Sequence, residues 1–118
     1  MAIPAIILCT ATGQPERTPI DATRVQSGQP LASVDNRFSS PDGRFHAGLW
    51  TSTVGRWRVQ YTEHEYCVLT QGRVRLQSDD GAVVECVAGD AFVIPAGFSG
   101  TWETLEDCAK HYVIYEPA

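Results

Sequence analysis

The sequence predicts an all-β protein, an antiparallel barrel or sandwich, and three observations lead to this fold class. From Arg44 onward, short segments rich in Val, Tyr, Trp, Phe and Thr recur between turn residues, a pattern typical of such folds. Asp79-Asp80-Gly81 lies between two of these segments, and an Asp-Gly pair readily takes the positive φ angles of a hairpin turn. No window of convincing length has helical periodicity, and only Thr101–Lys110 has room for a brief helical turn.

The first part of the chain, residues 1–44, is predicted to be an irregular N-terminal arm that precedes the barrel at 45–118. Residues 10–44 are rich in Thr, Ser, Pro, Gly, Asp and Gln with little periodicity, so we expect at most a short strand or two there. The apolar start, Met1–Cys9, lacks the positively charged region of a signal peptide and is interrupted by Pro4. We interpret this start as an edge strand that packs on a second copy at a dimer seam.

Eight segments after the arm are predicted to be strands, and alternation assigns their faces. In Arg73–Gln77 the apolar residues share one parity and the polar residues the other, so one face is expected to meet the core and the other water. The predicted strands are, in chain order, Phe45–Trp50, Arg56–Tyr61, Glu65–Thr70, Arg73–Gln77, Ala82–Val87, Asp90–Ile94, Gly100–Thr104 and His111–Tyr115.

Size and composition exclude several classes of protein. A chain of 118 residues is the length of one domain, and a formal net charge of −5 argues against a nucleic-acid partner. No apolar run approaches the roughly 20 residues that cross a bilayer, so no membrane partner is expected. The four cysteines form no C-x-x-C pair and lack the density of a secreted disulfide scaffold. We therefore expect reduced thiols and a cytoplasmic protein.

Two spaced motifs lie between Gly55 and Gly100. Glu65 is followed after six residues by Gly72, and Gly89 is followed after five residues by Pro95-Ala96-Gly97. These motifs resemble the two-part signature of the cupins, and over residues 45 to 116 the chain is similar to the short single-barrel cupins related to the ethanolamine-utilisation cupin and to the ureidoglycine-processing bicupins. The resemblance implies a single-domain, RmlC-like jelly-roll β-barrel, usually a homodimer, with a ligand cavity at its mouth.

The resemblance also implies a metal site that this sequence lacks the residues to build. Cupins commonly hold Fe, Mn, Ni or Zn with three imidazoles and one carboxylate. Of this set only the carboxylate, Glu65, is present. The expected imidazoles fall instead on Arg58 and Gln60, or on Val59 and Tyr61, and on Gly100. We therefore expect no cofactor and no metal ligands, with a divalent transition metal held through Glu65 as the disfavoured alternative.

Alternation gathers five candidate residues around the expected cavity. If Glu65 points inward, Cys67 points inward with it, and an inward Gly100 brings Trp102 to the same face. His111 opens the last predicted strand and can face the cavity, although the apolar pattern there leaves its parity open. Glu65 and His111 are therefore the candidate catalytic residues, as general acid and base. The candidate residues for substrate binding are Tyr61, Cys67 and Trp102.

Each candidate also has a structural interpretation. Glu65 can pair with an arginine such as Arg58, and a buried cysteine such as Cys67 commonly packs as a small hydrophobe. His111 can be an interior or interface histidine, and Trp102 and Tyr61 can serve the core and the backbone. His64 is expected to face away from Glu65, and His46 and Lys110 are expected to be exposed.

Three functions agree with these observations. The favoured one is a cupin that binds a small polar metabolite without a standard three-histidine metal site, and that can isomerise or hydrolyse it. The second is a non-catalytic binding or assembly barrel filled by its own side chains. The third is a metal-dependent enzyme, aminohydrolase- or isomerase-like, with an altered ligand set of Glu65 and His111 plus water or Cys67. Both an enzyme and a non-catalytic protein are compatible with the sequence.

Overall fold

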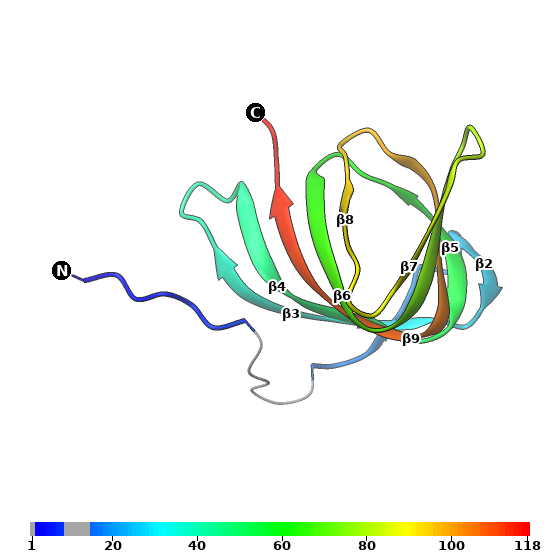
Figure 1. The fold of residues 1–118 in the computed structure, drawn as a ribbon, viewed down its shortest axis with the longest axis horizontal. Coiled ribbons are helices and arrows are strands. Elements are labelled where there is room, and N and C mark those ends of the chain that lie inside the picture. The colour runs from blue at the N-terminus through cyan, green and yellow to red at the C-terminus, as the bar shows by residue number, and fades with distance from the viewer. Residues whose placement is uncertain (1, 9–14) are drawn as a thin grey trace.

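In the computed structural model, which describes residues 2–8 and 15–118, nine strands form one strongly curled antiparallel sheet (Figure 1). The predicted all-β fold is confirmed, and no described residue is helical. Accordingly, no described segment is a helix long and apolar enough to cross a membrane. The strands are β1 (Thr18–Pro19), β2 (Val25–Gly28), β3 (Leu31–Ser39), β4 (Phe45–Ser52), β5 (Gly55–Gln60), β6 (His64–Ser78), β7 (Val83–Val87), β8 (Ala91–Ile94) and β9 (Ser99–Tyr115).

Two long strands, β6 and β9, pair with each other along most of their length and form the spine of the curled sheet. The other edge of β9 pairs first with β5 and then with β4, while the other edge of β6 pairs with β8 and then with β7. The register shifts where the two strands bend, and Gly72 lies at this bend with a φ of 85°. A Cβ on Gly72 would overlap the carbonyl oxygen of Asp107, so only glycine allows this approach of β6 to β9.

Both long strands unite segments that the sequence pattern separates. The predicted strands at Glu65–Thr70 and Arg73–Gln77 are one strand, β6, and those at Gly100–Thr104 and His111–Tyr115 are one strand, β9. The expected helical turn within Thr101–Lys110 is wrong, because this stretch pairs with β6 on one side and with β4 and β5 on the other. Cross-strand pairing of this extent overrides the weak local pattern.

The segment before the barrel holds more strand than its composition indicates. β1 pairs with β3, β3 pairs with β4 along its length, and β2 pairs with β5. Of the expected edge strand at Met1–Cys9, residues 2–8 form no strand, and Met1 and Cys9 lie outside the described residues. The predicted hairpin at Asp79-Asp80-Gly81 is confirmed, since this turn joins β6 to β7 and the Gly81 N–H donates to the Ser78 carbonyl at 2.9 Å.

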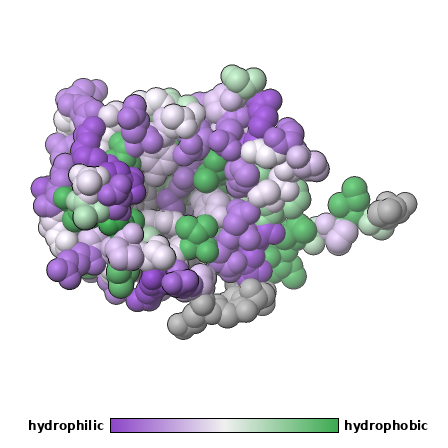
Figure 2. All heavy atoms as spheres, turned by 180° about the vertical axis from the view of Figure 1, so that it is seen from behind, coloured by the Kyte–Doolittle hydropathy of each residue, from purple (hydrophilic) through white to green (hydrophobic). Residues whose placement is uncertain are grey.

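The core lies inside the curl and follows the alternation of β6 and β9. Glu65, Cys67 and Leu69 of β6 are buried, as predicted, and so are Gly100, Trp102 and Thr104 of β9. The outer surface is mixed, and the face in Figure 2 is mainly hydrophilic with small hydrophobic groups and a hollow near its middle. Inward side chains therefore determine what the interior of the barrel contains.

Candidate functional site

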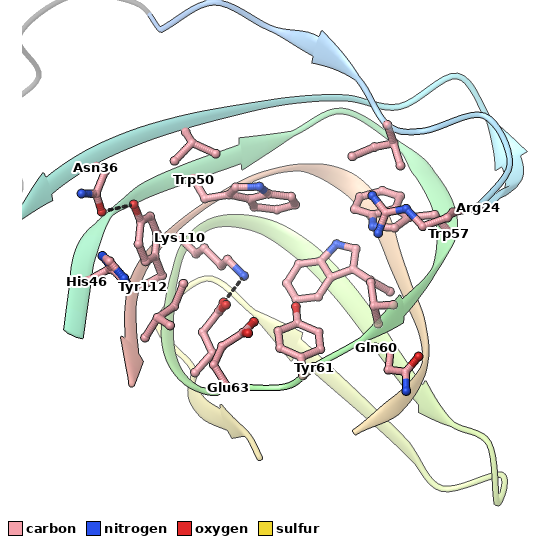
Figure 3. A pocket seen from close by; sticks show the side chains of 16 residues that line it. Arg24, Asn36, His46, Trp50, Trp57, Gln60, Tyr61, Glu63, Lys110 and Tyr112 are labelled. Carbon is pink, nitrogen blue, oxygen red and sulfur yellow. Dashed lines mark hydrogen bonds and ion pairs between the residues drawn. The ribbon is translucent and has the colours of Figure 1, made fainter. Parts of the chain in front are cut away.

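A cavity of about 470 Å³, here called the barrel cavity, lies inside the curled sheet (Figure 3). Its walls are inward residues of several strands, which alternation brings to one concave surface. Ion-pairing and hydrogen-bonding side chains lie beside three indoles, so the cavity combines an aromatic wall with polar groups. The lining residues used below are Arg24, Asn36, His46, Trp50, Trp57, Tyr61, Glu63, Glu65, Trp102, Lys110 and Tyr112.

The central polar feature of the cavity is an ion pair between Lys110 of β9 and Glu65 of β6, here called the Lys110–Glu65 pair. The Lys110 Nζ donates to Glu65 Oε2 at 2.6 Å, and the two side chains are 5% and 8% exposed. The same carboxylate oxygen accepts a hydrogen bond from the Cys67 Sγ at 3.0 Å. A short, charge-assisted bond of this kind in a buried place fixes both side chains.

Two indole rings complete the surroundings of the Lys110 ammonium. Its Nζ lies 4.7 Å from the ring centroid of Trp50 and 4.4 Å from that of Trp102. Both distances fall within the range of cation–π attraction. The Trp102 Nε1 donates to Thr104 Oγ1 at 2.9 Å, which holds this indole in place. The ammonium therefore lies against one carboxylate and two aromatic faces at the wall of the cavity.

The charge states of the buried groups follow from this arrangement. Burial is the largest single effect and lowers the pKa of Lys110, but the negative charge of Glu65, together with nearby Cys67 and Tyr61 and the hydrogen bond to Glu65, raises this pKa above its ordinary value. Burial raises the pKa of the Cys67 thiol. At neutral pH Lys110 is therefore a cation and Cys67 a protonated thiol, so neither is poised as a nucleophile.

Tyr61, directly after β5, presents a phenol to the cavity (Figure 3). Its backbone N–H donates to the Phe98 carbonyl at 2.9 Å, and the two aromatic rings meet edge to face at 6.2 Å. Burial raises the pKa of Tyr61, an effect that the charge of Lys110 offsets only in part. The hydroxyl thus remains protonated at neutral pH and can donate a hydrogen bond.

A third group of polar side chains lies at the β3–β4 end of the cavity. The Tyr112 hydroxyl donates to Asn36 Oδ1 at 2.7 Å. It also packs against Gly48, where an added Cβ would clash with this hydroxyl. His46 also lines the cavity, contrary to its expected exposure, and its Nε2 lies 3.1 Å from a carboxylate oxygen of Glu116.

The structure brings together most of the residues expected in the site. Glu65, Tyr61 and Trp102 line the cavity, and Cys67, which is fully buried, touches the site through its bond to Glu65. The expected pairing of Glu65 with Arg58 is wrong, because Arg58 forms its ion pair with Asp79 at 2.5 Å.

The structure places one candidate residue, His111, outside the cavity. Its register partners are Leu49 on β4 and Val68 on β6, and its neighbours Lys110 and Tyr112 both line the cavity. In a strand, neighbouring side chains point to opposite faces, so His111 faces outward. The expected exposure of Lys110 is wrong for the same reason, since this residue is only 4% exposed. The cavity therefore holds an ammonium where an imidazole was expected.

One signal for Lys110 was present in the sequence. Inward Gly100, Trp102 and Thr104 have even numbers, and an unbroken strand carries that parity on to Lys110. The assumed helical turn interrupted this count.

The cavity residues do not fit the metal that cupins usually hold. The Lys110 ammonium already contacts Glu65 Oε2 at 2.6 Å, so a divalent cation bound to this carboxylate would lie beside a like charge. At Gly100, the expected place of the third imidazole, a Cβ would overlap the Gln77 carbonyl oxygen. In addition, residues 2–8 and 15–118 contain no cluster of three or more His, Cys, Asp or Glu side chains with metal-binding geometry.

Comparison with known proteins agrees with this fold. Residues 39–112 match the family model described as an EutQ-like cupin domain. No curated protein sequence matches the chain significantly.

Three solved structures illustrate the likeness. A protein of unknown function of the DUF861 family from Pseudomonas syringae pv. tomato has a TM-score of 0.78 at 23% identity, covering 87% of this chain and 45% of that one. The Clostridium difficile EutQ protein has a TM-score of 0.66 at 19% identity, covering 73% and 63%. A putative ethanolamine utilization protein Q from Salmonella typhimurium has a TM-score of 0.65 at 19% identity, covering 92% and 100%. The chain thus spans less than two thirds of the length of the first two, and these likenesses establish the fold alone.

Proposed function

The chain belongs to the EutQ-like cupin family, and we propose that its barrel cavity binds a small polar metabolite without a standard three-histidine metal site. The observation that carries this proposal is a cavity of about 470 Å³ with the buried Lys110–Glu65 pair in its wall. Small-molecule sites in proteins have volumes of about 300–1,000 Å³ and combine apolar walls with a few convergent polar groups.

The open cavity favours this function over a barrel filled by its own side chains. Trp57 and Trp102 pack near each other with their centroids 6.5 Å apart, and the inward side chains still leave a cavity of about 470 Å³. A buried pair costs desolvation energy, so its position in a cavity wall supports a role in ligand recognition.

The groups around the cavity support binding more directly than covalent catalysis. Lys110 and Cys67 both hold their protons at neutral pH, so the ammonium is a hydrogen-bond donor and a fixed charge. Tyr61 adds a second donor. Any chemistry on the bound molecule would then use this fixed field to stabilise developing charge, as preorganised donors do in other enzymes.

We also propose that the protein is cytoplasmic. Cys67, Cys86 and Cys108 are buried free thiols, which supports a reducing compartment.

A thermal-shift screen of metabolites, followed by calorimetry, tests the proposed function. A ligand present at 100 times its Kd should stabilise the protein by about 2.7 kcal/mol. His111→Ala is the matched control, because this residue lies on the outer face of the same strand as Lys110. The stabilisation should persist in this control, weaken in Tyr61→Phe and disappear in the double variant Glu65→Gln/Lys110→Met.

The double variant avoids an unpaired buried charge, which costs about 3–5 kcal/mol when one partner of such a pair is removed. A ligand that stabilises the double variant as strongly as the parent binds elsewhere and contradicts the proposed site. A broad screen without any stabilising compound contradicts the function itself.

A further inference from the structure

Building on the proposed function, we infer that the barrel cavity selects an uncharged ligand that carries a carbonyl oxygen beside an N–H or O–H donor, as a primary amide does. The inference rests on three features of the cavity: the balance of its charges, the hydrogen-bonding groups left unused, and the place already taken by the Lys110 ammonium.

The charges around the cavity cancel. Apart from His46, its lining contains two basic side chains, Arg24 and Lys110, and two acidic ones, Glu63 and Glu65. The innermost of these, Lys110 and Glu65, neutralise each other at 2.6 Å. Arg24 is exposed and Glu63 half-buried, so they lie nearer the solvent. A charged ligand beside the inner pair would therefore find no unpaired opposite charge there, which is unfavourable in a medium of low polarity.

Three polar groups retain hydrogen-bonding capacity beside this neutral pair. Both contacts to the Glu65 carboxylate use Oε2, which leaves Oε1 as an acceptor. The Lys110 ammonium has three protons, and one of them goes to Glu65. The Tyr61 hydroxyl has no hydrogen-bond partner among residues 2–8 and 15–118.

These groups can be reached from the cavity. Among the described residues, the buried side-chain polar atoms without a partner are Arg37 Nη2 and Arg56 Nε, and neither Glu65 Oε1 nor the Tyr61 hydroxyl is one of them. Figure 3 shows the ends of Lys110 and Tyr61 directed into the same interior space. Two donors and one acceptor thus face one ligand, which matches a carbonyl oxygen adjacent to a donor.

Ligands of either charge meet an obstacle in this arrangement. A carboxylate attracted to Lys110 would approach Glu65, and Glu63 also lines the cavity. An ammonium would find the aromatic site for a cation taken, because Lys110 lies over both Trp50 and Trp102. A neutral amide pairs with the donors and the acceptor and leaves the ion pair intact.

A planar body suits the remaining walls. The indoles of Trp50 and Trp57 line the cavity with their centroids 6.2 Å apart and offer apolar surface beside the polar groups. Aromatic rings pack favourably against such surfaces in offset or edge-to-face arrangements. Benzamide, benzoate and benzylamine share one ring and differ in charge, so they form a matched set of probes.

Calorimetric titration of the three probes near neutral pH tests the inference. Benzamide should bind at least about tenfold more tightly than benzoate or benzylamine, because an uncompensated charge in a buried site commonly costs a tenfold or greater loss of affinity. His111→Ala should keep this order. Benzoate or benzylamine binding as tightly as benzamide overturns the inference.

Single variants of the pair should change the preferred charge. Glu65→Gln leaves Lys110 without its counter-ion, so benzoate should gain on benzamide by about tenfold, whereas Lys110→Met should favour benzylamine by a similar factor. Circular dichroism identifies a variant that fails to fold, and the order of the probes on the parent protein then decides the question alone. If none of the three probes binds, the inference is tested by the charge of the compound found in the metabolite screen. A charged compound overturns the inference but leaves the proposed function standing.

Discussion

Lys110 and His111 are neighbours in the sequence and lie on opposite faces of β9. Only Lys110 reaches the cavity, where its ammonium lies 2.6 Å from Glu65 and over two indoles. The exchange of an expected imidazole for an ammonium changes the chemistry of the site. An imidazole near neutral pH can move a proton, whereas an ammonium with a raised pKa keeps its protons. At the residue scale, the Lys110 side chain therefore gives the site a permanent positive charge paired with Glu65.

The stability of the protein should fall in alkaline solution for the same reason. The folded-state pKa values of Cys67, Tyr61 and Lys110 are all raised above their ordinary values of 9.0, 10.0 and 10.5. Above these values the unfolded chain releases protons that the folded protein retains, so the free energy of unfolding decreases with pH. The contribution is complete below about pH 9 and is lost progressively as the pH rises.

Urea unfolding between pH 7 and 11 measures this effect. Burial also raises the pKa of the Cys86 thiol, so the double variant Cys67→Ala/Cys86→Ala removes both raised groups with the lowest ordinary pKa, and its decline should begin nearer pH 10 than pH 9. A free energy of unfolding that stays constant from pH 8 to pH 11 in the parent protein contradicts the assignment of these groups as buried and protonated.

At the scale of elements, the sequence pattern predicts the faces of β6 well and those of β9 only in part. Alternation around Glu65 is clear, because apolar residues and one carboxylate share its parity. In β9 the stretch after Thr104 mixes apolar, polar and charged residues on both parities, and a bulge interrupts its pairing with β6. The parity of Lys110 depends on the strand remaining unbroken, and long-range pairing with β4 and β6 provides that continuity.

The steric restriction at Gly100 is likewise invisible in the sequence. Counting along the motif shows that the imidazole is missing there, but only the structure shows that β6 passes too close for any side chain. A Cβ at this position would overlap backbone atoms of Gln77 and Ser78. The loss of this ligand position is therefore a property of strand packing as well as of residue identity.

Gly100→Ala should destabilise the protein by about 1–3 kcal/mol or more, since added atoms in a packed interior force the backbone to shift. Gly97→Ala is the control: its Cβ would meet open space, but its φ of 95° disfavours a side chain by about 1–2 kcal/mol. Denaturant unfolding should rank Gly100→Ala below Gly97→Ala in stability. The reverse order contradicts the close packing of β6 on β9, and Gly100→His should then also be tolerated.

At the scale of the whole molecule, the resemblance to cupins and the apolar first residues lead us to propose a homodimer. Ile3, Ile6 and Ile7 are 90%, 49% and 64% exposed. Within the described chain, β7 and β8 each pair with β6 alone, so each has one free edge. Exposed apolar residues and free strand edges favour association with another chain, and a second copy can cover both.

Size-exclusion chromatography with light scattering at micromolar concentration tests the dimer, whose mass should be twice the chain's 12.9 kDa. If the apolar N-terminal segment forms the seam, Ile6→Ser/Ile7→Ser should shift the protein toward the monomer, because the change removes apolar surface from the interface. Val83→Ser/Val84→Ser is the control: it also replaces two exposed β-branched apolar residues by serine, here on β7, and should leave the dimer intact. A parent protein that elutes as a clean monomer refutes the dimer. A parent dimer that dissociates only with the β7 variant moves the seam from the N-terminal segment to the free edge of that strand.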